Sequence, residues 1–402
     1  MRIVFGAAVI ALATAACGDR GATLELGSEA RDSAGVSIVE SARPPDGSRL
    51  GWRVDSVPSV SIGALEGEEP YLLDQVRDAL TMPDGRIVVA NRSSQELRIF
   101  DASGIHVDTW GGRGEGPGEF NSLLEVAHWP GDSLIAWYSQ SDRLSVFDSS
   151  GNFGRTLIPG DLRAHVALPT GAILASGFSA GGFSLDDGRD RRQRNHEVVD
   201  ADGQVLASLG PFPGSEMHTS GSGNVFSIMT IPFTRSTRTT AWAGLFVVAP
   251  NDTYEIRAFE PAGALSRIVR RDHALVAPTP THTDAEIERR VALRPPEQQA
   301  ERRQELRRTF EEVPIAETFP AFDQIVADAL GHLWVEEYDL PGEPRTNPLW
   351  TVFDPEGRAL GFVETPAGMN VYEIGADYIL GRVTDDLGVE YVQVWSLMRS
   401  GG

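Results

Sequence analysis

Six polar residues fall at corresponding points of a repeated pattern, and they are the candidates for chemistry. When the repeats are aligned on the turn that precedes their second strand, equivalent positions hold Asp78, Glu125 and Gln324. Within one or two positions of this set lie Arg163, His165 and Asp323. Side chains of these types, brought together from different repeats, could bind a cation or a polar organic ligand. With oxygen ligands, the cation would be calcium.

The acidic members of this set also raise an electrostatic question. If Asp78, Glu125 and Asp323 converge, their carboxylates repel by about 1–4 kcal/mol, depending on the effective dielectric. A cation or the neighbouring Arg163 would have to offset that repulsion. We favour the arginine, because no set of His or Asn residues accompanies the carboxylates at the aligned positions. A water-filled channel would also be lined by polar residues without any ligand.

Common catalytic motifs are missing from the sequence. The Gly-rich segment Gly111–Phe120 has no Gly-Lys-Ser/Thr ending, and Pro117 stands where a dinucleotide-binding motif needs glycine. No Gly-x-Ser-x-Gly motif occurs, and the eight histidines are scattered. The acidic run Glu336–Asp339 could ligate calcium, although a solvated turn is the simpler interpretation. A serine or cysteine hydrolase is therefore not expected.

The elements that must position the candidates are short strands joined by acidic turns. An apolar strand ends in Asp, two spacers and Gly at Leu97–Gly104 and again at Leu144–Gly151. Weaker copies occur at Val198–Gly203, Ala258–Gly263 and Val352–Gly357, and a sixth strand without the turn at Tyr391–Trp395. Asp caps such a turn, and Gly adopts positive φ without steric cost.

The spacing of the repeats predicts an all-β, six-bladed β-propeller. The turns that start at 101, 148, 200 and 260 lie 47 to 60 residues apart, close to the size of a four-stranded blade. The longer interval to the turn at 354 is a blade plus an insertion. The last blade has strands near Val371–Ile374, Tyr378–Thr384 and Val389–Leu397 and lacks an outer strand. We expect the early strand Val54–Ile62 to complete it and close the ring. The innermost strands then line a central channel that holds the six candidates.

One segment, about 283–313, is predicted to be a helical insertion. Thr283 and Glu286 form a capping box, and Pro295-Pro296 separates two helices. The apolar stripe of this hairpin holds Ile287, Val291, Leu306, Phe310 and Val313. It could pack on its own propeller or serve as a lid or docking element, and we favour the first.

The segment Gly111–Phe120 resembles the linker of NHL-type and related six-bladed propellers. In that family a Gly-rich loop ending in Phe joins the outer strand of one blade to the inner strand of the next. The Phe100-Asp101-x-x-Gly104 and Phe147-Asp148-x-x-Gly151 turns fit the same pattern, and residues 72–157 match it best. Many such proteins are exported lipoproteins, and the family includes both binding modules and enzymes. The resemblance therefore implies a fold and not an activity.

The N-terminal region predicts export and lipidation. Residues 1–17 have a positive start, a short apolar stretch and Thr14-Ala15-Ala16-Cys17, which resembles a lipoprotein box. Lipidation of Cys17 would anchor the protein to a membrane, in the periplasm or at the cell surface. Cleavage after Ala15 without lipidation is the alternative. Residues 18–51 are expected to form a tether, which could contain one early strand at Val36–Glu40, and residues 52–402 the propeller.

Charge and repeat architecture together limit the function. The formal net charge of −22 disfavours nucleic acid as a partner. We expect a non-enzymatic module that binds a protein, peptide or glycan. The alternative is a metal-dependent enzyme of the six-bladed class, lactonase- or lyase-like.

Overall fold

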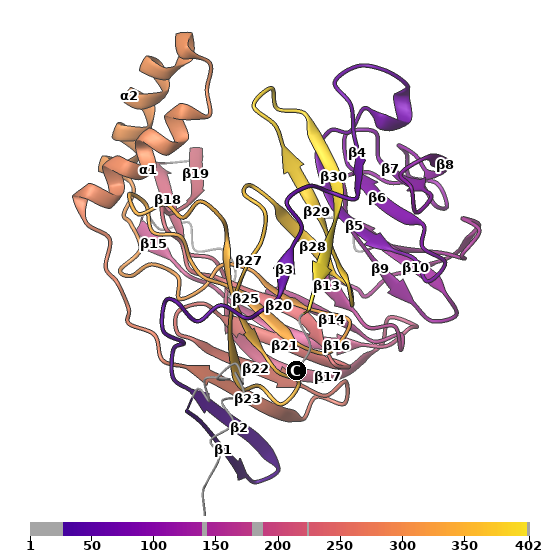
Figure 1. The fold of residues 1–402 in the computed structure, drawn as a ribbon, viewed down its shortest axis with the longest axis horizontal. Coiled ribbons are helices and arrows are strands. Elements are labelled where there is room, and N and C mark those ends of the chain that lie inside the picture. The colour runs from indigo at the N-terminus through magenta and orange to yellow at the C-terminus, as the bar shows by residue number, and fades with distance from the viewer. Residues whose placement is uncertain (1–26, 139–142, 179–187, 223–224, 400–402) are drawn as a thin grey trace, which may run out of the picture.

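The computed structural model describes residues 27–138, 143–178, 188–222 and 225–399 (Figure 1). Six antiparallel sheets follow one another along the chain as the blades of a propeller. The predicted signal segment 1–17, including Cys17, lies outside the described residues. Within them, neither helix is long and apolar enough to cross a membrane.

Each blade runs from an inner strand at the channel to an outer strand. Blades 1 and 2 contain β5 (Val76–Thr81), β6 (Ile87–Asn91), β7 (Glu96–Phe100), β8 (His106–Gly111), β9 (Leu123–Trp129), β10 (Ser133–Tyr138), β11 (Leu144–Phe147) and β12 (Phe153–Leu157). Blades 3 and 4 contain β13 (Arg163–Ala167), β14 (Ile173–Phe178), β16 (Gln193–Val199), β17 (Val205–Pro213), β20 (Thr237–Trp242), β21 (Leu245–Pro250), β22 (Glu255–Phe259) and β23 (Leu265–Arg271). Blades 5 and 6 contain β24 (Ile325–Ala327), β25 (Leu333–Glu336), β26 (Leu349–Phe353), β27 (Ala359–Glu364), β28 (Asn370–Ile374), β29 (Tyr378–Thr384) and β30 (Glu390–Met398).

The middle strands are apolar on both faces because each blade packs between two neighbours. In β6, Val88 and Ala90 join the core shared with blade 2, while Ile87 and Val89 join the core shared with blade 6. Side chains of a strand alternate between its two faces, so one strand supplies both interfaces. Corresponding cores lie between all other neighbouring blades, and together they hold the ring.

The predicted acidic turns join the third and fourth strands of the blades. In the first of them, Asp101 Oδ1 accepts hydrogen bonds from the backbone N–H groups of Ser103 (2.9 Å) and Ile105 (3.0 Å). Gly104 has φ +86°, which favours glycine. At the corresponding Gly151, an added Cβ would meet the indole of Trp110 at 2.1 Å. The turn prediction is confirmed. The Asp of the motif accepts the backbone hydrogen bonds of the turn, and the Gly adopts a conformation that other residues rarely take.

The N-terminal strand closes the ring as predicted, but in two pieces. The strands β3 (Arg53–Val54) and β4 (Val60–Ile62) both pair antiparallel with β30 and form the outer edge of blade 6. Pro58 lies between them and has no N–H to donate, which explains the interruption. The N-terminal and C-terminal segments of the propeller are therefore hydrogen-bonded to each other.

The predicted tether contains two strands, and not only the single early strand expected at Val36–Glu40. Strands β1 (Ser28–Ser33) and β2 (Val36–Ser41) form a hairpin, and β2 pairs in parallel with β23 of blade 4. Ile38 and Val39 are buried there, and Glu40 pairs with Arg270 at 2.7 Å. A short run of β-branched residues is enough to dock this segment on the free edge of blade 4.

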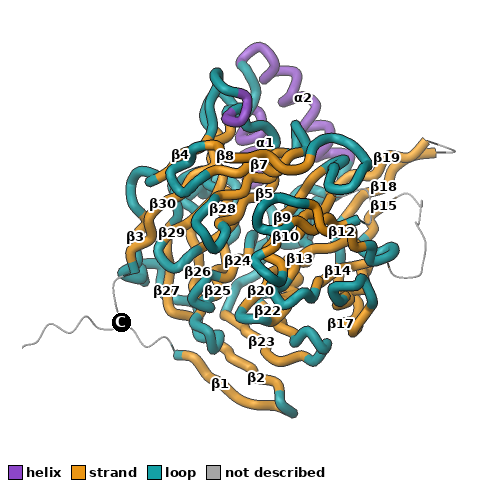
Figure 2. Tube along the Cα trace, turned by 90° about the vertical axis from the view of Figure 1, so that its right-hand side faces the viewer, coloured by secondary structure: helices purple, strands orange, loops and turns teal. Residues whose placement is uncertain are grey.

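One group of insertions, which we call the crest, projects from the face where the inner strands begin. It comprises the helices α1 (Pro280–Ala292) and α2 (Pro296–Glu312) and the small sheet of β15 (Gly188–Asp190), β18 (Met217–Ser222) and β19 (Val225–Thr230). The two helices lie in the connection from β23 to β24. Strands β18 and β19 lie in the connection from β17 to β20. The crest and the β1–β2 hairpin lie at opposite ends of the molecule (Figures 1 and 2).

The helical insertion is confirmed, with a different start. Helix α1 is capped by Thr279, whose partner in the capping box is His282 and not the predicted Thr283–Glu286 pair. Glu286 is instead buried and pairs with Arg289 (2.7 Å) and Arg290 (2.6 Å). Pro280 at the first helical position fixes this earlier start.

The apolar stripe of the hairpin packs within the crest. Ile287, Val291 and Leu306 form a small core of their own, which Phe310 extends. Phe310 also contacts Phe233, in the cluster that joins the helices to the base of the small sheet. The insertion therefore adds to the propeller without contributing to the cores between blades.

Candidate functional site

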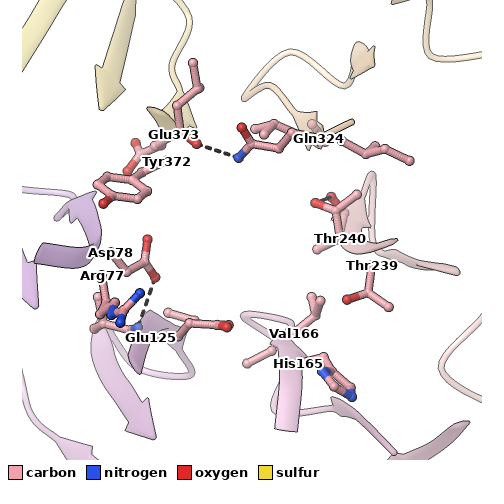
Figure 3. A pocket seen from close by; sticks show the side chains of 18 of the residues that line it. Arg77, Asp78, Glu125, His165, Val166, Thr239, Thr240, Gln324, Tyr372 and Glu373 are labelled. Carbon is pink, nitrogen blue, oxygen red and sulfur yellow. Dashed lines mark hydrogen bonds between the residues drawn. The ribbon is translucent and has the colours of Figure 1, made fainter. Parts of the chain in front are cut away.

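Backbone irregularities in three inner strands bring side chains to the channel. The pairing of β5, β13 and β28 with the next strand skips one residue each time, at Arg77, His165 and Tyr372. Such a bulge re-aims the extra side chain and is common next to binding sites. All three residues line one cavity at the starts of the inner strands (Figure 3).

This channel cavity has a volume of about 470 Å³ and draws on all six inner strands. Its polar lining residues are Arg77, Asp78, Glu125, His165, Thr239, Thr240, Gln324, Asn370, Tyr372 and Glu373. A second cavity of about 480 Å³ adjoins it and shares Glu125, Thr239, Gln324, Ile325 and Asn370. The second cavity adds Thr237, Arg238, Asp323 and Glu336. Together they form a polar site of the size that small ligands occupy.

Five of the six residues predicted from the sequence line these cavities. Asp78, Glu125, His165 and Gln324 line the channel cavity, and Asp323 lines the adjoining one. Arg163 lines neither and is exposed at the start of β13. In a regular strand Arg163 and His165 would share a face, but the bulge gives His165 a different direction.

Several lining residues were not predicted, notably Arg77, Tyr372 and Glu373. A signal for them exists in the sequence, because Val371-x-Glu373 matches Val76-x-Asp78, with a large polar side chain, Tyr372 or Arg77, between the two. Thr239, Thr240 and Asn370 carry no comparable signal, because threonine and asparagine are common in strands and turns.

Some of the lining side chains hold neighbouring blades together. The backbone N–H of Val126 in blade 2 donates to Asp78 at 3.1 Å, and that of Thr81 in blade 1 donates to Glu373 at 2.7 Å. Gln324 Nε2 donates to the carbonyl oxygen of Val371 at 2.7 Å (Figure 3). Asp78 and Gln324 therefore have a structural role, which leaves Glu125 as the predicted carboxyl most available to a ligand.

Burial raises the pKa of the carboxyl groups near the axis, and Arg163 does not pair with them. Burial raises the pKa of Asp78 to about 7, although backbone N–H groups partly stabilise its charge. Burial, and then repulsion from Asp78, raise the pKa of Glu125 to about 8. Burial likewise raises the pKa of Glu373. The predicted Arg163 pairing is wrong, since Arg163 forms no ion pair with any of them within the described residues.

The described residues also do not assemble a metal site. Within these ranges, no group of three or more His, Cys, Asp or Glu side chains could hold a metal ion. The acidic run Glu336–Asp339 is not a solvated turn either, since Glu336 lines the second cavity and Glu337 is buried. Calcium in the channel stays a prediction from the sequence.

His165 is held as a neutral ring. Burial, with repulsion from His196 and two arginines, lowers its pKa to about 3. Its Nε2 lies 2.6 Å from Ser176 Oγ, and its ring stacks on His196 with centroids 5.8 Å apart. Ser176 is fully buried, so this Ser–His contact orients the ring and presents no accessible nucleophile. The site is built for recognition by hydrogen bonds and charge.

Replacing Glu125 by Gln is expected to change the pH dependence of stability. A carboxyl whose pKa is raised by folding stabilises the folded state below its unfolded pKa, and this contribution is lost as pH rises through the folded value of about 8. Glutamine stays neutral, so Glu125→Gln should be more stable than wild type at pH 9 by about 1–2 kcal/mol, a value reduced by water in the channel. At pH 4 the two proteins should differ little. Urea unfolding across this range measures the effect, and parallel pH profiles would contradict it.

Comparisons with known proteins agree with this architecture. A family model described as a 6-bladed β-propeller (DUF5128) matches residues 52–157, which hold the closing strands and the first two blades. A comparison with curated proteins gave no match. A solved structure of a Bacteroides fragilis protein described as exported is 10% identical, with a TM-score of 0.51 over 90% of this chain and 100% of its own.

A second solved structure, a member of the duf4221 family from Bacteroides vulgatus, is 10% identical and covers 87% of this chain and 99% of its own, with a TM-score of 0.48. At such identities, structural similarity informs on fold and not on activity. The fold evidence comes from the six sheets themselves, the matched family model and the Bacteroides fragilis structure. This chain has the fold of a six-bladed β-propeller.

Proposed function

We propose that this protein is an exported lipoprotein whose propeller binds a ligand in the channel cavity. The observation that carries the proposal is the set of bulges that present Arg77, His165 and Tyr372 to one cavity of about 470 Å³. A bulge gives up regular strand pairing, and each of the three presents its extra residue to the same cavity. The ligand is a peptide, a segment of a protein, or a glycan.

Binding, and not catalysis, is the function that the geometry supports best. The imidazole of His165 is neutral and tied to a buried serine, and the described residues form no metal group. No observation favours the lactonase- or lyase-like alternative over a binding module. The crest rises from the face where the cavity opens, and it would enlarge the surface available to a ligand longer than the channel.

A plugged channel is expected to abolish ligand binding. In a Cys17→Ala protein, Thr240→Cys introduces the only thiol, and it lies on the cavity wall. Labelling it with a bulky maleimide should remove the thermal stabilisation that peptides, amino-acid derivatives or sugars confer on the unlabelled protein. The matched control is Ala102→Cys, in an exposed turn at the blade edge, labelled in the same way. A ligand that stabilises the plugged protein as strongly as the control would place the site elsewhere.

The proposed anchor has its own test. Cys17 is the single cysteine and ends a short apolar segment, as a lipidation site requires. Cys17→Ala should move the protein from the membrane fraction to the soluble fraction and abolish incorporation of a fatty-acid analogue. The export of a protein of similar fold supports the proposal. Unchanged membrane association of Cys17→Ala would refute lipid anchoring.

A further inference from the structure

We propose that the ligand of the channel carries a cationic group, an amine or guanidinium next to an amide, as a basic side chain of a peptide does. This inference rests on the proposed function and names its ligand class. It starts from Glu125, which lines both cavities. Within the described residues the Glu125 carboxyl has no hydrogen bond and no ion pair.

Of the other four acidic side chains that line the two cavities, Asp78, Glu373 and Asp323 already have partners, and Glu336 lines only the adjoining cavity. Asp78 accepts two backbone N–H groups, and Glu373 accepts one and a hydrogen bond from the Tyr378 hydroxyl. Asp323 pairs with Arg238 at 2.6 Å. Glu125 is therefore the one carboxyl, among the described residues, that lines both cavities and has no partner, and we assign its counter-charge to the ligand.

A second, independent observation comes from the strand next to Glu125. Trp137 of β10 is the direct cross-strand partner of Glu125, and it also lines the channel cavity. Its side chain is 4% exposed, and its indole N–H has no hydrogen-bond partner within the described part of the chain. A buried unpaired donor is costly, on the order of 1–3 kcal/mol. A ligand that carries an acceptor beside its cation would satisfy both groups.

The charges around the cavities agree with a cationic ligand. Asp78, Glu125, Asp323, Glu336 and Glu373 line the two cavities, against two arginines, Arg77 and Arg238. Arg238 is neutralised by Asp323, and His165 carries no charge. Arg77 makes no ion pair within the described residues, so it can meet a carbonyl or carboxylate at the other end of the ligand.

An organic cation fits this set better than a metal ion. A divalent metal requires several ligands around one point, and the described residues contain no such group. A guanidinium or ammonium needs one carboxylate and a few hydrogen-bond acceptors, which Glu125, Thr239 and Thr240 supply. The cavity volume of about 470 Å³ is ample for a basic side chain with its flanking amides.

The test compares three derivatives with the same flanking amides by calorimetric titration: Nα-acetyl-arginine methylamide, its neutral citrulline isostere, and the shorter, anionic glutamate analogue. Wild type should bind the arginine derivative at least about tenfold more tightly than the citrulline derivative, the order of one charge-assisted contact. Glu125→Gln should remove this preference and leave the citrulline affinity unchanged. The control Glu29→Gln removes the same charge from the exposed β1–β2 hairpin and should change nothing.

The outcomes separate the inference from the proposed function. If the citrulline or glutamate derivative binds wild type as tightly as the arginine derivative, and the Thr240 plug blocks it, the ligand class is wrong and the channel remains the site. If the arginine derivative binds but the plug has no effect, both proposals fail. Failure of the arginine derivative to bind overturns the inference, and the wider ligand panel then decides the function. If Glu125→Asp keeps the preference for the arginine derivative and Glu125→Gln loses it, the preference comes from the carboxylate charge.

Discussion

Removal of the closing strands should prevent the propeller from folding. Proteins that start at Gly27, Gly51 and Gly63 differ stepwise in the β1–β2 hairpin and in the β3–β4 pair. The last truncation exposes the edge of β30. In the full-length protein, the carbonyl oxygens of Ser396 and Val394 in β30 accept hydrogen bonds from the backbone N–H groups of Asp55 (3.0 Å) and Ser59 (2.8 Å). It also removes Ile62, which is buried between blades 6 and 1. The free-energy cost of unpaired backbone groups and an exposed core together is comparable to the whole free energy of unfolding of a typical domain, about 5–15 kcal/mol.

We therefore expect the protein that starts at Gly63 to aggregate or to lack a cooperative transition. The protein that starts at Gly51 should keep a closed ring and lose about 2–4 kcal/mol, because Ile38 and Val39 no longer cover blade 4. Circular dichroism and urea unfolding of the three proteins provide the measurement. Equal stability of the Gly51 and Gly63 proteins would show that β3 and β4 do not close the ring.

Replacing Glu337 by Ala should be the most destabilising single change in the junction of blades 4 and 5. Arg271 Nη1 and Nη2 donate to Glu337 at 2.5 and 3.1 Å, and Thr351 Oγ1 lies 2.7 Å from both partners. The guanidinium lies 3.8 Å from the ring centroid of Tyr254. The Arg271 side chain is 0% exposed, so loss of its partner leaves a buried charge without compensation. Such a loss costs about 3–5 kcal/mol.

The matched control is Glu364→Ala, which removes the partner of Arg49 from an ion pair whose two side chains are 42% and 41% exposed. An exposed pair contributes about 0–1 kcal/mol, so the control should unfold almost as wild type does. The double variant Arg271→Met/Glu337→Leu should recover most of the loss, because apolar groups fill the space without a charge. Similar midpoints for Glu337→Ala and Glu364→Ala in urea would contradict this account.

The architecture could be predicted because it depends on local signals that repeat. An Asp and a Gly at fixed spacing define each outer turn, and continuous apolar runs such as Ile87–Ala90 define strands that pack on two neighbours. The closing strand followed from counting, since the last blade lacked one. Local signals also misplaced a boundary: Thr283 has a valid capping pattern, but Thr279 followed by Pro280 provides a better helix start.

The site could be predicted only in part, because its geometry depends on pairing between strands. Repeat alignment located Asp78 and Glu125, yet the bulges at Arg77 and Tyr372 become visible only when the cross-strand register is known. The prediction that Arg163 lies at the channel was wrong for the same reason. The bulge at His165 makes the side chains of Arg163 and His165 point in different directions. The role of Asp78 and Gln324 in joining blades also depends on contacts with other strands, which the sequence does not encode locally.

The most direct test of the central claim is a crystal structure of the protein with the tightest-binding compound of the ligand panel. We predict electron density for the compound in the channel cavity, in contact with Glu125 and with at least one of the bulged residues Arg77, His165 and Tyr372. Density on the crest, on the β1–β2 hairpin or at the cavity beside Tyr254 and His273, with only water in the channel, would contradict the claim.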